Sequence, residues 1–211
     1  DKSVRLLLAL SRIVAEERFD FLGVKCLGEV INYYASCCLA ISVLNDRGLP
    51  TACQADIPAA FTMKLMAELS GGACAFADLV HVDYQSGLAR LVNCGTMPTS
   101  LAADRHAVAW GWQYEYMGKG RGVTPIFSCR GGPATICCLA RVRGKLTLQV
   151  VTGQVEEHPV TDLGEVRDIW AQAFVRLDGD PEFLVRSLRS NHVIMAYGDL
   201  RSGLHHVCDL L

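Results

Sequence analysis

Residues 51–82 read TACQADIPAAFTMKLMAELSGGACAFADLVHV, and this stretch decides the expected fold. Asp56 suits the N-cap of a helix, because its carboxylate can accept a bond from a first-turn amide and Pro58 lies where no amide donor is needed. Apolar residues follow at helical spacing, and Ser70-Gly71-Gly72 is typical of a helix end. Residues 73–82 are small and mostly apolar, which indicates a buried strand. The stretch therefore predicts a helix at 57–69 between two strands.

Two polar residues, Gln54 and Asp78, fall on the strands that flank this helix. In a strand-helix-strand unit, residues near corresponding strand ends converge on one pocket, where ligands usually bind. The preceding residues predict a helix at 2–18, a strand at 19–26 and a helix at 29–44. Alternating helices and strands predict a parallel α/β layer over residues 1–84 that contains this strand-helix-strand unit.

The pattern changes after residue 84. Short apolar segments at 88–92, 123–129, 134–143 and 145–151 are separated by glycine turns, which predicts an antiparallel barrel or sandwich. Helices are expected at 165–177, 181–188 and 200–211, with a strand at 191–199 before the last of them. The expected fold class is thus α/β plus an antiparallel β-barrel-like part, with a second domain at 85–211.

Composition excludes several classes of protein. The 211 residues are 51% hydrophobic and 20% charged, which is typical of a globular chain. The formal net charge of −2 does not favour nucleic acid or an anionic membrane surface as a partner. No apolar run approaches the roughly 20 residues that cross a bilayer, so a cytoplasmic location is expected. The chain begins with Asp1 and enters a helix at once, which suggests a fragment of a longer protein.

Ten cysteines raise the possibility of a disulfide scaffold. Their spacing argues against it, because Cys37-Cys38 and Cys137-Cys138 are adjacent pairs inside apolar runs and no Cys-x-x-Cys occurs. Buried free thiols of a cytosolic protein are the expected state.

Three features are candidates for chemistry, and each has a structural alternative. Asp78 interrupts an apolar strand, where a carboxylate must be paired, hydrogen-bonded or bound to a metal; it is either a ligand or a structural cap. His192 begins the last strand and is either a ligand or a satisfied structural histidine. The alternating aromatics Trp110, Trp112 and Tyr114 are either a platform for sugars or ordinary packing on a barrel strand, and packing is the preferred interpretation.

The order and spacing of several short motifs resemble the C-terminal half of the L-fucose isomerase family, which is related in fold to L-arabinose isomerase. These motifs are Val24-Lys25-Cys26, Cys53-x-Ala55-Asp56, Phe76-Ala77-Asp78, Asn93-Cys94-Gly95 with Pro98, Gly131-Gly132-Pro133-Ala134-Thr135, and Asn191-His192 with Gly198-Asp199. The resemblance covers nearly the whole chain.

The resemblance implies the architecture of the L-fucose isomerase C-terminal part and an intramolecular oxidoreductase that interconverts an aldose and a ketose through a cis-enediol. It implies a divalent cation, Mn²⁺ or Mg²⁺, at Asp78 and His192, with Asn191 beside them as a contact to the monosaccharide. Oxygen ligands with one imidazole suit these cations. The family also implies longer chains with N-terminal α/β domains, and a homo-oligomer whose sites are completed by a neighbouring subunit.

The chain departs from the family at Gln54, where the family's Cys-Glu-Ala-Asp motif has its catalytic glutamate. By the resemblance, Gln54 occupies the position of the third metal ligand and of a catalytic residue. An amide, however, has no ionisable proton to exchange. Asp56 lies two residues after Gln54 and points to the same strand face if the strand continues that far, so it would then replace this carboxylate. A role as helix N-cap competes with this interpretation. The open alternatives are an isomerase with Asp78 as principal base, a non-catalytic sugar-binding relative, and a site altered by mutation.

Overall fold

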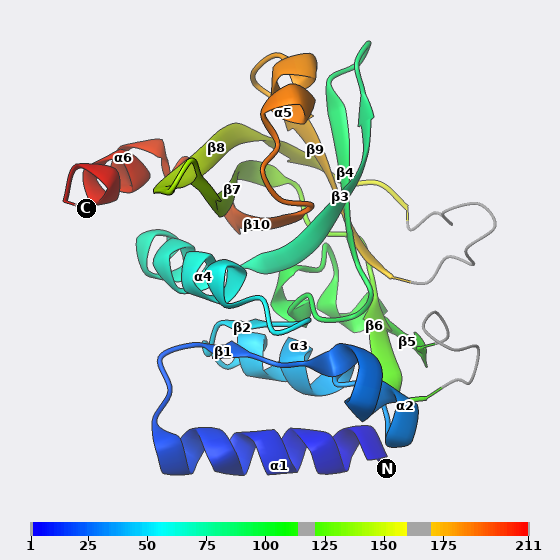
Figure 1. The fold of residues 1–211 in the computed structure, drawn as a ribbon. Coiled ribbons are helices and arrows are strands. Elements are labelled where there is room, and N and C mark those ends of the chain that lie inside the picture. Colours follow the sequence, from blue (N-terminus) through cyan, green and yellow to red (C-terminus); the bar gives the residue numbers. More distant parts are fainter. Residues whose placement is uncertain (1, 114–120, 160–169, 211) are drawn as a thin grey trace.

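The computed structural model describes residues 2–113, 121–159 and 170–210. Antiparallel strands form a closed barrel in the order β10-β3-β4-β9-β8-β7 (Figure 1). The sheet closes because β10 pairs with β3 on one side and with β7 on the other. The strands are Ala75–Asp83 (β3), Leu88–Asn93 (β4), Gly132–Val142 (β7), Lys145–Glu156 (β8), Ala171–Leu177 (β9) and His192–Tyr197 (β10). The expected antiparallel part is therefore present, and it also contains β3.

Side chains alternate between the inside and the outside of this barrel, as the pleat of a strand requires. On β3, Ala75 and Ala77 belong to the core inside the barrel, whereas Phe76 belongs to a second core outside it. On β10, Val193 and Met195 point inside and Ile194 outside. The outer core is the contact between the barrel and the rest of the chain.

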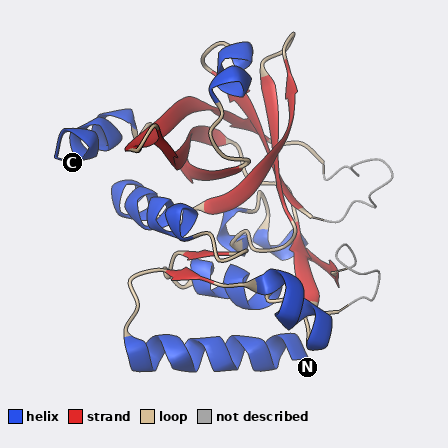
Figure 2. Ribbon diagram, viewed as in Figure 1, coloured by secondary structure: helices blue, strands red, loops and turns tan. Residues whose placement is uncertain are grey.

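Helices and a small parallel sheet cover this outer face. Helix α4 (Ile57–Ser70) lies against the barrel strands β10 and β7, and on its other side it contacts β2 (Figures 1 and 2). Strand β2 (Thr51–Ala52) pairs in parallel with β1 (Leu22–Gly23). Below them lie the packed helices α1 (Lys2–Glu17) and α3 (Cys38–Asp46), as Figure 1 shows. Helix α4 is thus the layer that joins the two parts.

The start and end of α4 agree with the prediction. The Asp56 side chain accepts a bond from the amide of Ala59, Pro58 lies in the first turn, and Gly71 ends the helix in the left-handed conformation with φ of 67°. Gly takes this conformation more readily than other residues, which explains Gly71 at the helix end.

The expected parallel strand-helix-strand unit is wrong, because β2 and β3 lie in different sheets. The expected single helix at 29–44 is also wrong. The segment is divided among a π-helix η1 (Cys26–Val30), a short α2 (Ile31–Tyr33) and α3, and the break between α2 and α3 begins at Tyr34, whose φ of −131° and ψ of −82° are not helical. The domain boundary proposed at residue 84 stays a prediction; it falls in the turn between the paired strands β3 and β4.

The helix expected at 165–177 is wrong over its second half. Residues 171–177 form β9, which pairs with β4 and β8, while residues 165–169 lie outside the described residues. Apolar Ala171, Ala173, Val175 and Leu177 recur at every second position and point into the barrel. This period of two agrees with a strand, and the sheet around the segment provides the hydrogen bonds.

The remaining elements lie around these parts. Strand β5 (Ala109–Trp112) pairs with β6 (Val123–Ile126) in a separate sheet, where Trp110 and Trp112 are 52% and 56% exposed. The prediction that these two residues pack on a barrel strand is therefore wrong. Tyr114 lies outside the described residues. The short helices are η2 (Thr99–Leu101), η3 (Arg105–Ala107), α5 (Pro181–Ser187) and α6 (Arg201–Leu210).

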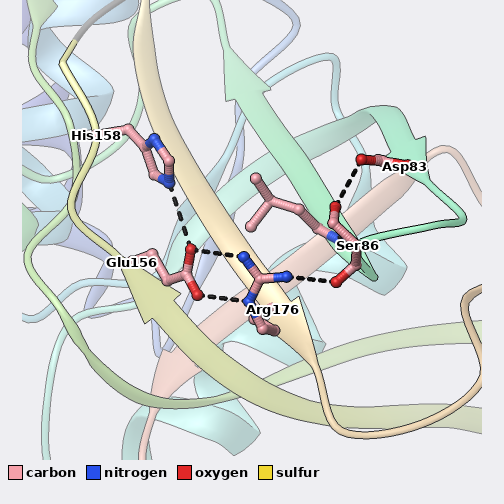
Figure 3. Close-up of polar contacts among 6 residues, drawn as sticks. Asp83, Ser86, Glu156, His158 and Arg176 are labelled. Atoms are coloured by element: carbon pink, nitrogen blue, oxygen red, sulfur yellow. Dashed lines mark hydrogen bonds and ion pairs between the residues drawn. The ribbon is translucent and has the colours of Figure 1, made fainter.

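A cluster of polar side chains joins three strands at one end of the barrel (Figure 3). The guanidinium of Arg176 on β9 donates to both carboxylate oxygens of Glu156 on β8, at 2.5 and 3.0 Å. It also donates to the backbone oxygen of Ser86 in the β3–β4 turn, and the hydroxyl of Ser86 donates to Asp83 at 2.6 Å. The ring of His158 lies 3.4 Å from Glu156. Because Arg176 on β9 bonds to both β8 and the β3–β4 turn, this cluster links the strands.

All ten cysteines are free thiols, eight of them buried, with Cys94 half-buried and Cys208 exposed. Within the described ranges, no helix has the length and apolar character needed to cross a membrane.

Candidate functional site

The strand pleat brings two of the expected site residues to the outer face of the barrel. Asp78 follows Phe76 by two positions on β3, and His192 precedes Ile194 by two positions on β10. Both therefore share the outer face with those core residues. The register pairs His192 directly with Asp78 and Ile194 with Phe76. A mid-chain carboxylate and an imidazole from near the end of the chain are thus cross-strand neighbours.

Asp78, Asn191 and His192 form a close group. The Nε2 atom of His192 lies 3.7 Å from Oδ1 of Asp78, too far for a hydrogen bond. The side-chain amide of Asn191 donates to the same oxygen at 3.0 Å. The ring of His192 packs on Phe76, with 4.7 Å between the ring centroids, which fixes its orientation. The sequence prediction that these three residues lie together agrees with this geometry.

Asp56 joins this group from the start of α4. Its Oδ1 accepts the helix-capping bond from the Ala59 amide at 2.9 Å, and its Oδ2 lies 2.7 Å from Nδ1 of His192. The sequence left open whether Asp56 is an N-cap or a site residue. In the structure one carboxylate oxygen caps the helix and the other contacts His192, so the capping role does not prevent a contact with the candidate site.

The partner of Nδ1 determines which nitrogen of His192 carries a proton. An ionised carboxylate only accepts hydrogen bonds, so Nδ1 donates to Asp56. The opposite nitrogen, Nε2, is buried and has no hydrogen-bond partner among the described residues. A histidine that donates through one nitrogen to a carboxylate and presents the other to a cation is the usual arrangement in metal sites. The orphaned Nε2 and the nearby Asp78 oxygen therefore fit a divalent cation.

The surroundings shift the pKa values of all three ionisable groups. The hydrogen bond from His192 lowers the pKa of Asp56 and keeps it charged. Burial raises the pKa of Asp78, and nearby His192 opposes this only in part. The bond to Asp56 raises the pKa of His192 against the effect of burial. The raised pKa of Asp78 suits a carboxylate that takes up a proton. A cation at Nε2 of His192 would compete with a proton for the same nitrogen.

Gln54 does not share the expected strand with Asp56. Strand β2 ends at Ala52, and Gln54 and Ala55 both have left-handed backbone, with φ of 58° and 54°. The argument from alternating strand faces is therefore wrong. The Gln54 backbone amide lies 3.4 Å from Sγ of Cys26, and its side chain makes no hydrogen bond to a described residue. Two successive non-glycine residues in this conformation are rare and concentrate at functional sites.

In the part of the chain that the structure describes, no three His, Cys, Asp or Glu side chains form a metal-binding group. Asp78 and His192 provide two candidate ligand atoms that face each other. The predicted third ligand, Gln54, belongs to a residue type outside that set, so its role stays a prediction.

A pocket of about 260 Å³ opens beside the Asp56–His192 pair. It lies between the first turn of α4, the outer face of β7 and the segment that leads into β10. Its lining residues are Asp56, Pro58, Ala59, Thr62, Cys138, Leu139, Ala140, Arg141, Arg189, Ser190, His192 and Ile194. The sequence analysis missed Arg141 and Arg189, although the position of Arg141, four residues after the outward-facing Cys137 on β7, places it on the outer face.

Comparison with known proteins gives a consistent result. A family model described as "L-fucose isomerase, C-terminal domain" matches residues 91–211. A sulfoquinovose isomerase of Clostridium sp. (strain MSTE9) is 26% identical over 220 residues, which cover 100% of this chain and 47% of that protein. One of Priestia megaterium is 24% identical over 199 residues, 92% of this chain and 43% of that protein. One of Alkalicoccus urumqiensis is 26% identical over 153 residues, which cover 72% of this chain and 34% of that protein.

The chain thus spans less than half the length of these curated relatives.

Proposed function

The chain belongs to the L-fucose isomerase family, and from this premise we propose that it is the metal-binding part of an aldose-ketose sugar isomerase. The observation that carries the proposal is the pairing of Asp78 with His192 across β3 and β10, with a buried Nε2, partnerless among the described residues, facing the Asp78 carboxylate. A site built only for stability would satisfy that nitrogen, because a buried polar atom without a partner costs free energy.

In this proposal Asp78, His192 and Gln54 hold a divalent cation, Mn²⁺ or Mg²⁺. When bound, such a cation polarises the carbonyl and the neighbouring hydroxyl of the sugar. Asp78 takes the proton from C2 and returns it to C1, while the proton of the C2 hydroxyl moves to the C1 oxygen, so that the reaction passes through a cis-enediol. Asn191 orients Asp78 and offers a hydrogen bond to a sugar hydroxyl, and Asp56 holds the His192 ring in place.

The proposed substrate is a monosaccharide. The curated relatives carry the name sulfoquinovose isomerase, so sulfoquinovose is the first sugar to test, with L-fucose beside it. The homo-oligomeric assembly and the cytoplasmic location expected from the sequence belong to the same proposal. The size of the complete protein in solution tests the assembly.

The alternative is a non-catalytic sugar-binding relative. Gln54 favours it, because the group that replaces the family's glutamate cannot exchange a proton. The absence of a hydrogen bond from the Gln54 side chain to a described residue also fits this alternative. It predicts sugar binding that does not depend on metal and no exchange between aldose and ketose.

Titration of the complete protein with Mn²⁺, followed by electron paramagnetic resonance of the free ion, tests the proposal. We expect Asp78→Ala and His192→Ala to weaken binding by about tenfold or more, since each removes one ligand. Asp83→Asn, on the same strand, should not. Proton NMR in D₂O should show aldose-ketose exchange with deuterium entering the carbon-bound position. The isomerase proposal is contradicted if Mn²⁺ affinity is the same in the Asp78→Ala and His192→Ala variants as in wild type, or if no sugar shows aldose-ketose exchange.

A further inference from the structure

We propose that Arg141 and Arg189 form a subsite for the anionic end of the sugar, in the pocket that Asp56 and His192 also line. The inference rests on the proposed function and names the substrate class: a monosaccharide that carries a sulfonate or a phosphate ester at the end opposite its carbonyl. Both arginines line the pocket and are exposed to solvent there.

Neither guanidinium is used elsewhere in the described structure. Arg141 and Arg189 form no ion pair with a described residue and donate no side-chain hydrogen bond to one. Other arginines of the chain do: Arg176 binds Glu156, Arg186 binds Glu182 and Arg201 binds Asp199. Two such guanidinium groups at one small pocket repel each other, so an anion between them would stabilise the pair.

The carboxylate in the pocket does not neutralise them. Asp56 is the acidic residue among those that line it, and both of its oxygens are occupied, one by the Ala59 amide and one by His192. Pro58 and Ala59 belong to the first turn of α4, whose helix dipole adds partial positive charge at the same place. The charge of this pocket therefore favours an anionic group.

The position of the arginines suits the far end of a substrate. Strand β7 lies next to β10, and β10 lies next to β3. Continuing the register Ile194↔Cys137 places Leu139 level with His192 and Asp78, so Arg141 lies two strands across and two residues along from Asp78. This separation is roughly 12 Å between the backbones, and the long arginine side chain shortens it. A six-carbon sugar with its carbonyl end at Asp78 and His192 would direct its last carbon toward the arginines.

Guanidinium groups recognise sulfonate and phosphate by the same chemistry, because both anions present several oxygens to the planar fork of donors. The proposed subsite thus discriminates charged from neutral sugars. The two anions differ in charge at neutral pH, so binding experiments separate them.

Calorimetric titration of the complete protein with sulfoquinovose, glucose 6-phosphate and glucose tests the inference. We expect at least one of the anionic sugars to bind more tightly than glucose. Arg141→Ala and Arg189→Ala should each weaken its binding by about tenfold or more and leave glucose unchanged. Arg189→Lys should bind the anionic sugar more tightly than Arg189→Ala but less tightly than wild type, because lysine keeps the positive charge and lacks the planar guanidinium that donates two parallel hydrogen bonds. The control is Arg186→Ala, which removes the same charge three residues away.

The outcomes separate this inference from the isomerase proposal. Asp78→Asn should abolish sugar exchange yet keep the preference for the anionic sugar. If the wild-type protein exchanges no sugar but its arginine variants lose that preference, the subsite stands and the isomerase proposal falls. Equal binding of all three sugars, or arginine variants that weaken glucose as much as the anionic sugar, overturns the subsite.

Discussion

Asp56 and His192 are 136 positions apart in the chain, yet Oδ2 of Asp56 lies 2.7 Å from Nδ1 of His192. This contact connects the N-terminus of α4 to the first residue of β10. It also connects stability to the site, because the other oxygen of the same carboxylate caps the helix. The Asp56 side chain therefore links helix and barrel and also orients the proposed metal ligand.

Two substitutions at Asp56 should separate these roles. Asparagine caps helices as well as aspartate, so Asp56→Asn should keep the capping contribution to the free energy of unfolding and lose only the stabilisation from the charged bond to His192. It removes the charge beside His192, and loss of such a supporting carboxylate lowers metal affinity by about 10–100-fold. Asp56→Ala should lose the same affinity and also about 1 kcal/mol of stability. Urea unfolding and Mn²⁺ titration measure both; normal Mn²⁺ affinity in Asp56→Asn contradicts the supporting role.

The Gln54→Glu variant should turn over sugar faster than the wild-type protein. The substitution restores an ionisable group and a negative charge at the place where the family has its glutamate, and a positioned acid or base contributes about 10²-fold or more. Turnover of sulfoquinovose and L-fucose by the complete protein is the measurement. Gln54→Ala is the control that removes the side chain. An equal rate for Gln54→Glu and wild type would show that the amide does not limit the reaction.

Stability should fall in acid through Glu156. Arg176 holds the pKa of Glu156 below its ordinary value of 4.5. The unfolded chain therefore takes up this proton first, and the stabilisation, complete above pH 4.5, is lost as the pH falls through the lower pKa of the folded state. Glu156→Gln should flatten the loss of thermal stability between about pH 5 and pH 3. Glu182→Gln, which breaks a pair within α5, is the control. An unchanged slope contradicts the role of the Glu156–Arg176 pair.

Gly95 should tolerate no side chain. Its φ is 130°, and a Cβ there would overlap the side chain of Thr124 and lie 2.9 Å from Cβ of Cys38. Gly95→Ala should destabilise the protein by about 1–3 kcal/mol through overpacking, in addition to the backbone strain. Gly144→Ala is a matched control, because Gly144 also has positive φ, 83°, but a Cβ added there would meet no described atom within 4 Å. Equal unfolding midpoints for the two variants would contradict a clash at Gly95.

Much of the site could be predicted from local patterns. The capping residue, the proline in the first turn and the glycine end of α4 follow from a few neighbouring residues, and so does the strand that carries Asp78. The likeness of Asn191-His192 and Phe76-Ala77-Asp78 to a family pattern placed these residues in one site, and β3 and β10 do pair there. These predictions depend on short-range backbone preferences and on motifs that stay intact in the sequence.

Local sequence patterns determined the ends of α4 and the strand that carries Asp78, and the resemblance to a family placed Asp78 and His192 in one site. Tertiary structure decided that β3 belongs to the barrel, that residues 171–177 are a strand, that Gln54 leaves the strand with positive φ, and that Arg141 and Arg189 line one pocket with Asp56. The reason is that periodicity states which face of its own element a residue occupies. Which elements meet, and in which register, depends on packing and hydrogen bonds between segments that lie far apart in the chain.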